Sequence, residues 1–193
     1  MKAPHFIYLL LFVHFANTTL GQLGSRERKY DIVTGTLTDE QFSQLKQFLY
    51  LSTRKPLRDT IFIKYDFNMS DCWHNLDMRS NDSTIAARNK LQKAYLAQQE
   101  EVRPQITIFK FREKGRNCNR VTKLNTNILV DEQKFLKRLL FKTPIMCGTG
   151  AIIMPDMRYL LVMNDSHFDV LYFTKTHIED FMEGNNSIHL VPN

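Results

Sequence analysis

Two stretches rich in β-branched and aromatic residues, separated by a helical pattern, constrain the fold of this chain most. Residues 60–67 and 105–111 contain neither glycine nor proline, and both are predicted to be strands, the first largely buried. Between them, residues 81–83 offer three N-cap side chains, and an apolar stripe at helical spacing follows and stops before Pro104. Strands separated by a helix pair in parallel through a right-handed crossover. The pattern therefore predicts an α/β protein.

Further elements flank this unit. Thr38 and Gln41 have the spacing of a capping box, which predicts a helix that ends near Pro56. Asp131 begins another predicted helix, with acidic residues at its start and basic residues towards its end, as the helix dipole favours. The predicted elements that close the chain are strands over 158–163 and 168–173, a hairpin turn over 164–167, and a helix over 177–182 capped by Thr176.

The chain begins with Met1 and Lys2, followed by an apolar run over residues 6–15 and then by small and polar residues. This is the pattern of a signal peptide, and we expect cleavage between Gly21 and Gln22. The apolar run is shorter than the about 20 residues that span a bilayer, so an uncleaved anchor is the less favoured alternative. The expected organisation is a signal peptide over 1–21, a flexible mature N-terminus over 22–37, the α/β domain over 38–184 and a C-terminal tail over 185–193.

Four Asn-X-Ser sequons follow the expected signal peptide, at Asn68, Asn81, Asn164 and Asn185. A sequon is short and arises by chance, but an upstream secretory signal makes glycosylation more credible. We expect at least two to carry glycans. The predicted location is extracellular, with no transmembrane anchor.

The chain has three cysteines, Cys72, Cys118 and Cys147. A small protein held by disulfides has more cysteines in a shorter chain, so a hydrophobic core must hold this fold. In an oxidising compartment we expect two cysteines to pair and one to be left over, buried, reactive or linked to another chain.

The order of predicted elements resembles the thioredoxin-like fold over residues 38–183, in which parallel strands are followed by an antiparallel hairpin. Cys72 follows the first strand at about the distance where thioredoxin-like proteins have their nucleophilic cysteine. Asn75 stands where the family has its second cysteine, so dithiol exchange by the two-cysteine motif is excluded. The resemblance also implies a cis-proline before the penultimate strand, for which Met154-Pro155 is the candidate, although it lies slightly early.

The same resemblance implies that Cys72, Cys118 and Cys147 gather at one end of the sheet. A disulfide between two of them is then expected, with Cys118 to Cys147 as the first choice. Cys72 would become a single thiol close to a helix N-terminus, where the dipole favours thiolate, or a structural or paired cysteine.

Basic residues are concentrated in one segment of fourteen residues, where Glu113 is the opposing charge. A strand that alternates basic and apolar residues would present part of this run on one face. In a secreted protein such a surface could bind heparan sulfate or an anionic membrane, whereas nucleic acid is not expected as a partner. The alternative is a solvated loop. The candidate anion-binding residues are Lys110, Arg112, Lys114, Arg116, Arg120 and Lys123.

Patterns for a metal or cofactor are missing from the sequence. No C-x-x-C, H-x-x-H or H-E-x-x-H spacing occurs, so we expect no metal site. Residues 147–151 contain two glycines but lack the third glycine and the length of a nucleotide loop, and we interpret them as a flexible turn. No cofactor is expected.

The interpretation that the sequence favours is a secreted, redox-inactive, thioredoxin-like glycoprotein that acts by binding an unidentified protein partner or receptor. This interpretation leans away from an enzyme, and the question stays open because one alternative is enzymatic. One alternative is a monothiol oxidoreductase or isomerase of the secretory pathway that uses Cys72. A second alternative is an extracellular factor that binds glycosaminoglycans through the basic segment.

Overall fold

The chain divides into two compact units, Met1–Lys29 with Ser187–Asn193, and Tyr30–Asn186. In the first unit, strands β1 (Arg26–Lys29) and β8 (Ser187–Leu190) pair in antiparallel fashion. The second unit contains the remaining elements. The computed structural model describes residues 26–68, 81–115, 124, 128–146, 148–165 and 168–190.

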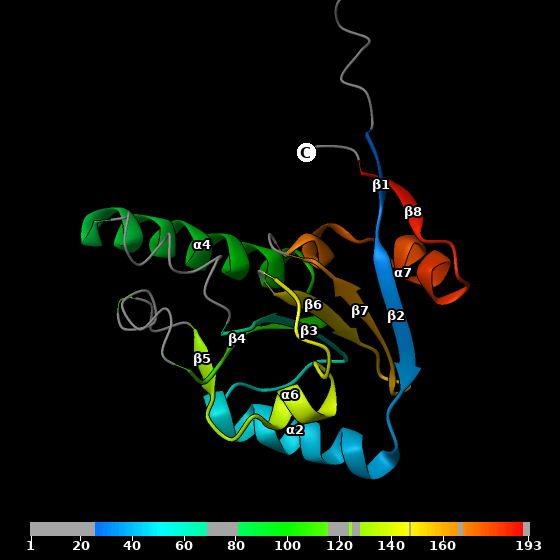
Figure 1. Ribbon diagram of the computed structural model, residues 1–193, viewed down its shortest axis with the longest axis horizontal. Helices are drawn as coiled ribbons and strands as arrows, with labels where there is room; N and C mark the ends of the chain where they lie inside the picture. The colour runs from blue at the N-terminus through cyan, green and yellow to red at the C-terminus, as the bar shows by residue number, and fades with distance from the viewer. Residues whose placement is uncertain are drawn as a thin grey trace, which may run out of the picture. The chain divides into compact units, whose positions relative to one another are not determined.

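Within the second unit, the described residues form a mixed six-stranded sheet (Figure 1). The strand order is β2-β7-β6-β3-β4-β5, in which β3, β4 and β5 run parallel. The pairs β2 with β7, β7 with β6 and β6 with β3 are antiparallel. The strands are β2 (Asp31–Thr36), β3 (Thr60–Asp66), β4 (Ile106–Glu113), β5 (Leu129–Asp131), β6 (Thr149–Ile153) and β7 (Arg158–Met163).

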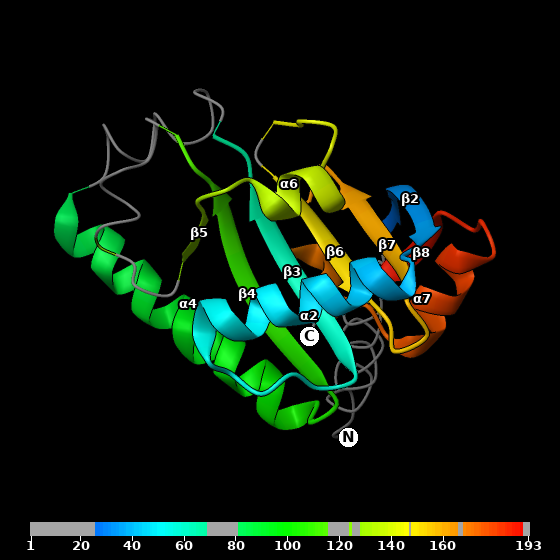
Figure 2. The same cartoon turned by 90° about the horizontal axis from the view of Figure 1, so that it is seen from below.

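Helices lie on both faces of this sheet, as Figure 2 shows from below. Leu45, Leu49, Leu136 and the buried side chains of the central strands form the main hydrophobic core, which places α2 and α6 on one face. On the opposite face α4 and η1 contact β4 and β6 respectively. The helices are α2 (Asp39–Thr53), α4 (Asp82–Val102), α6 (Phe135–Leu139), the 3-10 helix η1 (Asp169–Tyr172) and α7 (Lys175–Met182).

Local sequence signals explain the first half of the fold. Thr38 and Gln41 form the predicted capping box, with the Gln41 backbone N–H donating to the Thr38 hydroxyl at 3.2 Å. Asn81 caps α4, and its side-chain carbonyl oxygen accepts the Thr84 backbone N–H at 2.8 Å. The predicted parallel pairing of β3 with β4 is confirmed. The arrangement of a parallel pair next to an antiparallel hairpin is that of a thioredoxin-like sheet.

The second half corrects several predictions. Residues 31–36, expected to be flexible, form the edge strand β2. Residues 149–151, part of the 147–151 stretch interpreted as a flexible turn, belong to the fully buried strand β6 (Thr149–Ile153). The antiparallel hairpin is therefore β6 and β7, whereas the predicted strand over 168–173 is the helix η1. The N-cap of α7 is Thr174 and not Thr176. Asp131 ends β5, and its carboxylate accepts the Phe135 backbone N–H at the start of the shorter helix α6.

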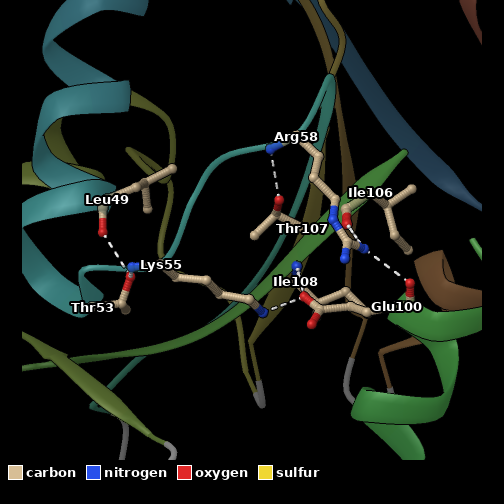
Figure 3. Close-up of polar contacts among 8 residues, drawn as sticks. All are labelled: Leu49, Thr53, Lys55, Arg58, Glu100, Ile106, Thr107 and Ile108. Carbon is tan, nitrogen blue, oxygen red and sulfur yellow. Dashed lines mark hydrogen bonds and ion pairs between the residues drawn. The ribbon is translucent and has the colours of Figure 1, made fainter. Parts of the chain in front are cut away.

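A partly buried carboxylate, that of Glu100, protects one edge of the sheet (Figure 3). Strand β5 pairs only with Phe111–Glu113, so the rest of β4 has an open edge. There Glu100 of α4 accepts the Ile108 backbone N–H at 2.6 Å and also binds the Lys55 ammonium. Arg58 donates to the Ile106 carbonyl at 3.0 Å. These contacts satisfy backbone groups that would otherwise attract another strand.

We expect Glu100→Ala to lower the free energy of unfolding by about 1–3 kcal/mol, because it leaves the Ile108 N–H without its acceptor. Glu100→Gln should cost less, since the amide oxygen can still accept. Urea unfolding of the purified protein measures both. The exposed neighbour Glu101→Ala is the matched control, and a Glu100→Ala variant as stable as this control would contradict the assignment.

Candidate active site

Charged side chains occupy one face of the two central parallel strands. Lys64 and Asp66 of β3 stand opposite Lys110 and Arg112 of β4 in the sheet register. Lys64, Asp66 and Arg112 are at most 3% exposed, and Lys110 is partly buried. Their alternation with core residues such as Tyr65 places them on the face that α4 covers. Together with Asp165 they are named here the buried charge cluster.

The cluster is held by a small number of direct contacts. The Lys64 ammonium donates to the Asp165 carbonyl oxygen and lies 3.6 Å from the nearer carboxylate oxygen of Asp66. Lys110 donates to the side-chain oxygen of Gln92 on α4 at 2.9 Å. Neither carboxylate oxygen of Asp66 accepts a hydrogen bond from the described residues, so Lys64 is its direct ion-pair partner among them.

Two glycines at β6 make room for these charges. A Cβ atom on Gly148 would lie 2.8 Å from the Asp66 carboxylate and 2.9 Å from the Lys64 ammonium, and Gly148 has φ of 98°. A Cβ on Gly150 would collide with the Asp165 carboxylate. Larger residues at either position would displace the buried charges, so these glycines are part of the site.

Asp165 links the cluster to the chain that follows β7. Its carboxylate accepts the backbone N–H groups of Asp169 and Val170, the latter at 3.5 Å, and so fixes the start of η1. Burial raises the pKa of Asp165, although the Lys64 charge opposes this. Burial lowers the pKa of Lys110, while the Asp66 charge acts in the opposite direction. The cluster therefore contains groups of both signs whose charged forms are disfavoured by burial.

A second network ties the ends of β3 and β4 to α6. Burial alone would raise the pKa of Glu113, but hydrogen bonds from Lys137 and from the Asn68 backbone N–H outweigh it and hold that pKa below its usual range. On the core side, the Tyr65 hydroxyl donates to the Asp131 carboxylate at 3.1 Å. Burial, assisted by this carboxylate, raises the pKa of Tyr65. The carboxyl ends of both strands are thus fixed on both faces.

The three cysteines for which the sequence made predictions, Cys72, Cys118 and Cys147, lie outside the described residues. The predicted parallel pairing of β3 with β4 is confirmed, and both strands end where β6, a strand that was not predicted, begins. The three cysteines follow or precede these points in the sequence. Their pairing, including Cys118 with Cys147, stays a prediction.

The candidate anion-binding residues do not form a single exposed stripe. Lys110 and Arg112 face inward, because their strand positions alternate with core residues on a sheet that α4 covers. Lys114 is exposed and forms an ion pair with Glu132 at 2.6 Å. The surface interpretation is therefore wrong for Lys110 and Arg112. The remaining candidates, Arg116, Arg120 and Lys123, lie outside the described residues.

The four sequon asparagines differ in exposure. Asn81, Asn164 and Asn185 are exposed, whereas Asn68 is half-buried with its side chain against Gly115. Exposure of the first three is compatible with attached glycans. Glycosylation itself stays a prediction.

Pro155 does not occupy the implied cis position. All peptide bonds among the described residues are trans, including Met154–Pro155. Pro155 lies in the turn between β6 and β7, where the Met154 backbone N–H donates to the Arg158 carbonyl at 2.9 Å. The wrong proline assignment follows from the wrong hairpin. In the six-stranded sheet the last strand but one is β6, and the residue just before it is Gly148.

Sequence reasoning missed three of the five residues of the cluster, Lys64, Asp66 and Asp165. Lys64 and Asp66 belong to a run predicted only as a buried strand, although two charges at positions i and i+2 of such a strand must share one face. That spacing was a usable signal. Asp165 gave no signal, since its contact with Lys64 spans 101 residues of sequence.

Metal ligands and membrane-spanning helices were considered for the described residues alone. The described part of the chain contains no group of three or more His, Cys, Asp or Glu side chains that could hold a metal ion. Among the same residues, no helix combines the length and the apolar character that crossing a membrane requires.

Comparison with known proteins identifies distant structural likenesses. No protein-family model matches the chain, and no curated protein matches it. A secreted Mycobacterium tuberculosis disulfide oxidoreductase homologous to E. coli DsbE is 13% identical, with a TM-score of 0.34 over 60% of this chain and 79% of its own. The thioredoxin domain of a Bacteroides vulgatus thiol-disulfide oxidoreductase is 12% identical, with a TM-score of 0.36 over 80% of this chain and 95% of its own.

The fold itself is thioredoxin-like α/β: a mixed sheet flanked by helices, with β3 and β4 parallel and the hairpin of β6 and β7 beside β3. This assignment rests on the order and pairing of the strands.

The raised pKa of Asp165 has a defined consequence for stability. The folded protein binds the proton of the Asp165 carboxyl group more tightly than the unfolded chain does. The protonated group therefore stabilises the fold fully below the ordinary pKa of about 3.9, and this stabilisation is lost as the pH rises through the pKa of the folded state. We expect wild type to lose stability relative to Asp165→Asn as the pH rises through this range. Urea unfolding at a series of acidic pH values measures the difference.

Asp156→Asn is the control for this experiment. The Arg158 guanidinium holds the pKa of Asp156 below its usual range, so any contribution of Asp156 is lost as the pH falls, the opposite direction. Asp156 is exposed, and its effect should be small. A stability difference between wild type and Asp165→Asn that is independent of pH would contradict the account.

Proposed function

We propose that this protein is an extracellular thioredoxin-like glycoprotein that binds partners through a single thiol, Cys72, in a mixed disulfide. The observation that carries the proposal is the buried charge cluster at the end of β3, the strand that leads to this cysteine. Asp66 precedes Cys72 by six residues, so the chain limits their separation to about 20 Å. The expected signal peptide over 1–21 and the sequons support the extracellular location.

The charges of the cluster favour a thiolate. Lys64, Lys110 and Arg112 outnumber the carboxylates Asp66 and Asp165, so the buried charge cluster itself has an excess of positive charge when all five groups are ionised. A nearby positive potential lowers the pKa of a cysteine and raises its thiolate fraction. Buried charges act over longer distances than solvated ones because they are less screened.

The chemistry that follows is thiol–disulfide exchange with a partner disulfide. The Cys72 thiolate attacks one sulfur of that disulfide and forms a new S–S bond, while the other sulfur leaves as a thiolate. Asn75 stands where a second cysteine would displace the partner. The mixed disulfide would therefore persist, which makes binding the outcome of the reaction.

Non-covalent binding by a redox-inactive protein is the second candidate, and Asn75 favours it because dithiol chemistry is excluded. This candidate expects Cys72 to be paired or inaccessible. Binding of heparan sulfate has weaker support, because Lys110 and Arg112 face inward.

Alkylation of the secreted protein without reduction, followed by peptide mapping, tests the thiol. We expect rapid modification of Cys72 near neutral pH and, after incubation with glutathione disulfide, a stable mixed disulfide at Cys72. Asn75→Cys should convert this adduct into an intramolecular disulfide with release of glutathione, whereas the control Asn75→Ser should retain it. Cys72 found in an internal bridge, or modified only after unfolding, would favour non-covalent binding instead.

Glycosylation at Asn81 can be separated from its capping role. The Asn81 side-chain oxygen accepts the Thr84 backbone N–H and the Ser83 hydroxyl, both at 2.8 Å, whereas a glycan attaches to the amide nitrogen. Asn81→Asp should remove a glycan and keep the cap. Asn81→Ala should remove both and lower the free energy of unfolding by about 1 kcal/mol relative to Asn81→Asp.

Mass spectrometry of the secreted variants before and after enzymatic deglycosylation, with urea unfolding of the deglycosylated forms, measures the two effects. Ser83→Ala is a second control, since it destroys the sequon and leaves Asn81 in place. An Asn81 peptide without glycan in the wild-type protein would contradict the assignment of this site.

A further inference from the structure

The two edges of the sheet are protected differently. At the part of β4 that β5 does not cover, Glu100 and Arg58 bind backbone groups of the strand, and Lys55 and Arg58 both bind Glu100. Strand β2, at the opposite edge, pairs with β7 alone among the described strands (Figure 1). Its sequence is Asp-Ile-Val-Thr-Gly-Thr, without lysine, arginine or proline, the residues that usually discourage edge pairing. An edge of this kind is suited to accept another strand.

The outward backbone groups of β2 can be assigned from two hydrogen bonds. The Leu37 N–H donates to the Met157 carbonyl at 3.0 Å, on the β7 side. Because N–H directions alternate along a strand, the odd residues 31, 33 and 35 also face β7. Ile32, Thr34 and Thr36 therefore direct their N–H and carbonyl groups outward. Tyr30 belongs to the same even set, but its N–H already donates to the Asn186 carbonyl at 2.9 Å.

These three residues define one favourable antiparallel register with a second copy of β2. A two-fold axis at Thr34 pairs Thr34 with Thr34 and Ile32 with Thr36, and uses every outward group. A register centred on Val33 would instead require the Tyr30 N–H, which is occupied. In the favoured register the cross-strand pairs are β-branched and uncharged, a combination that stabilises paired strands.

Side chains on the opposite face of β2 are complementary in the same register. Val33 is 44% exposed, and the register places it opposite Gly35 of the second copy. Gly35 lies under Tyr159: a Cβ at Gly35 would be 2.5 Å from the Tyr159 hydroxyl oxygen. Tyr159 is partly buried, and Val33 of the second copy would pack against the part of its ring that stays exposed beside Gly35. Contacts between aromatic and β-branched residues stabilise neighbouring strands.

We propose that β2 is a self-association surface, on which two copies of this protein join their sheets through antiparallel β2 strands centred on Thr34. The resulting sheet is continuous across the two copies. It leaves the buried charge cluster and the β4 edge in each copy unchanged, so this inference is independent of the thiol proposal.

A cysteine placed on the two-fold axis tests the register. Residues of a directly opposed hydrogen-bonded pair have Cα atoms about 5.5 Å apart, within the range that a disulfide can bridge. Thr34→Cys, secreted from cells, should form a covalent dimer whose peptide map contains a disulfide between the two introduced thiols. Val33→Cys is the matched control, because its partner in this register is Gly35. Equal cross-linking of both variants, or none through position 34, would overturn the register.

Sedimentation equilibrium of the glycosylated wild-type protein tests the association itself. We expect a reversible dimer, and we expect Thr34→Lys to raise its Kd about tenfold or more, because two like charges would lie directly opposite each other. Ala97→Lys adds the same charge at an exposed position of α4 and should leave the Kd unchanged. A wild-type protein that stays monomeric at high concentration, or a dimer that Thr34→Lys does not weaken, would overturn the proposal.

Discussion

Burial of charge at the carboxyl ends of β3 and β4 is the constraint on which the rest of the structure depends. Lys64 and Asp66 are almost fully inaccessible and 3.6 Å apart, and removing one of such a pair leaves the other without compensation. Gly148, just before the neighbouring strand β6, consequently has no side chain that would meet these two charges, and Gly150 within β6 leaves room for the Asp165 carboxylate. Asp165 completes the arrangement, because it accepts the N–H groups that start η1 while its carbonyl binds Lys64. Sheet, hairpin and η1 are thereby coupled through one polar contact region.

This region distinguishes the scaffold from a sheet stabilised by packing alone. On the opposite face, Leu45, Leu49 and Leu136 cover apolar strand residues and supply the hydrophobic stabilisation. The charged face is instead sensitive to substitution, because removing one member of a buried ion pair leaves the other charge uncompensated. Its location at the end of the strand that precedes Cys72 connects the scaffold to the proposed thiol. The two edges of the sheet also differ: a carboxylate protects the edge of β4, whereas β2 has no lysine, arginine or proline and pairs with β7 alone among the described strands.

The first half of the fold follows from local signals that act within a few residues. The capping box at Thr38, the cap at Asn81 and the buried runs of β3 and β4 all have strong local patterns, and their predictions are confirmed. Strand β6 was missed because Gly148 and Gly150 disfavour a strand locally. Gly148 is required by Lys64 and Asp66 of β3, and Gly150 by Asp165, which follows β7. The helix η1 was mistaken for a strand because its apolar run lacks a distinctive period and Asp165 fixes it from outside. The buried charge cluster was missed in part for a similar reason: it depends on a contact between Lys64 and Asp165, which are 101 residues apart in the sequence.

The central claim is that the buried charge cluster controls the reactivity of Cys72, and the pH dependence of its alkylation tests this most directly. Lys110→Met removes a positive charge inside the cluster, whereas Lys114→Met removes one from the exposed continuation of the same chain segment. The account predicts that the alkylation midpoint of Cys72 in wild type lies below the ordinary thiol pKa of about 8.5 and rises in Lys110→Met but not in Lys114→Met. Equal midpoints in all three proteins would contradict it.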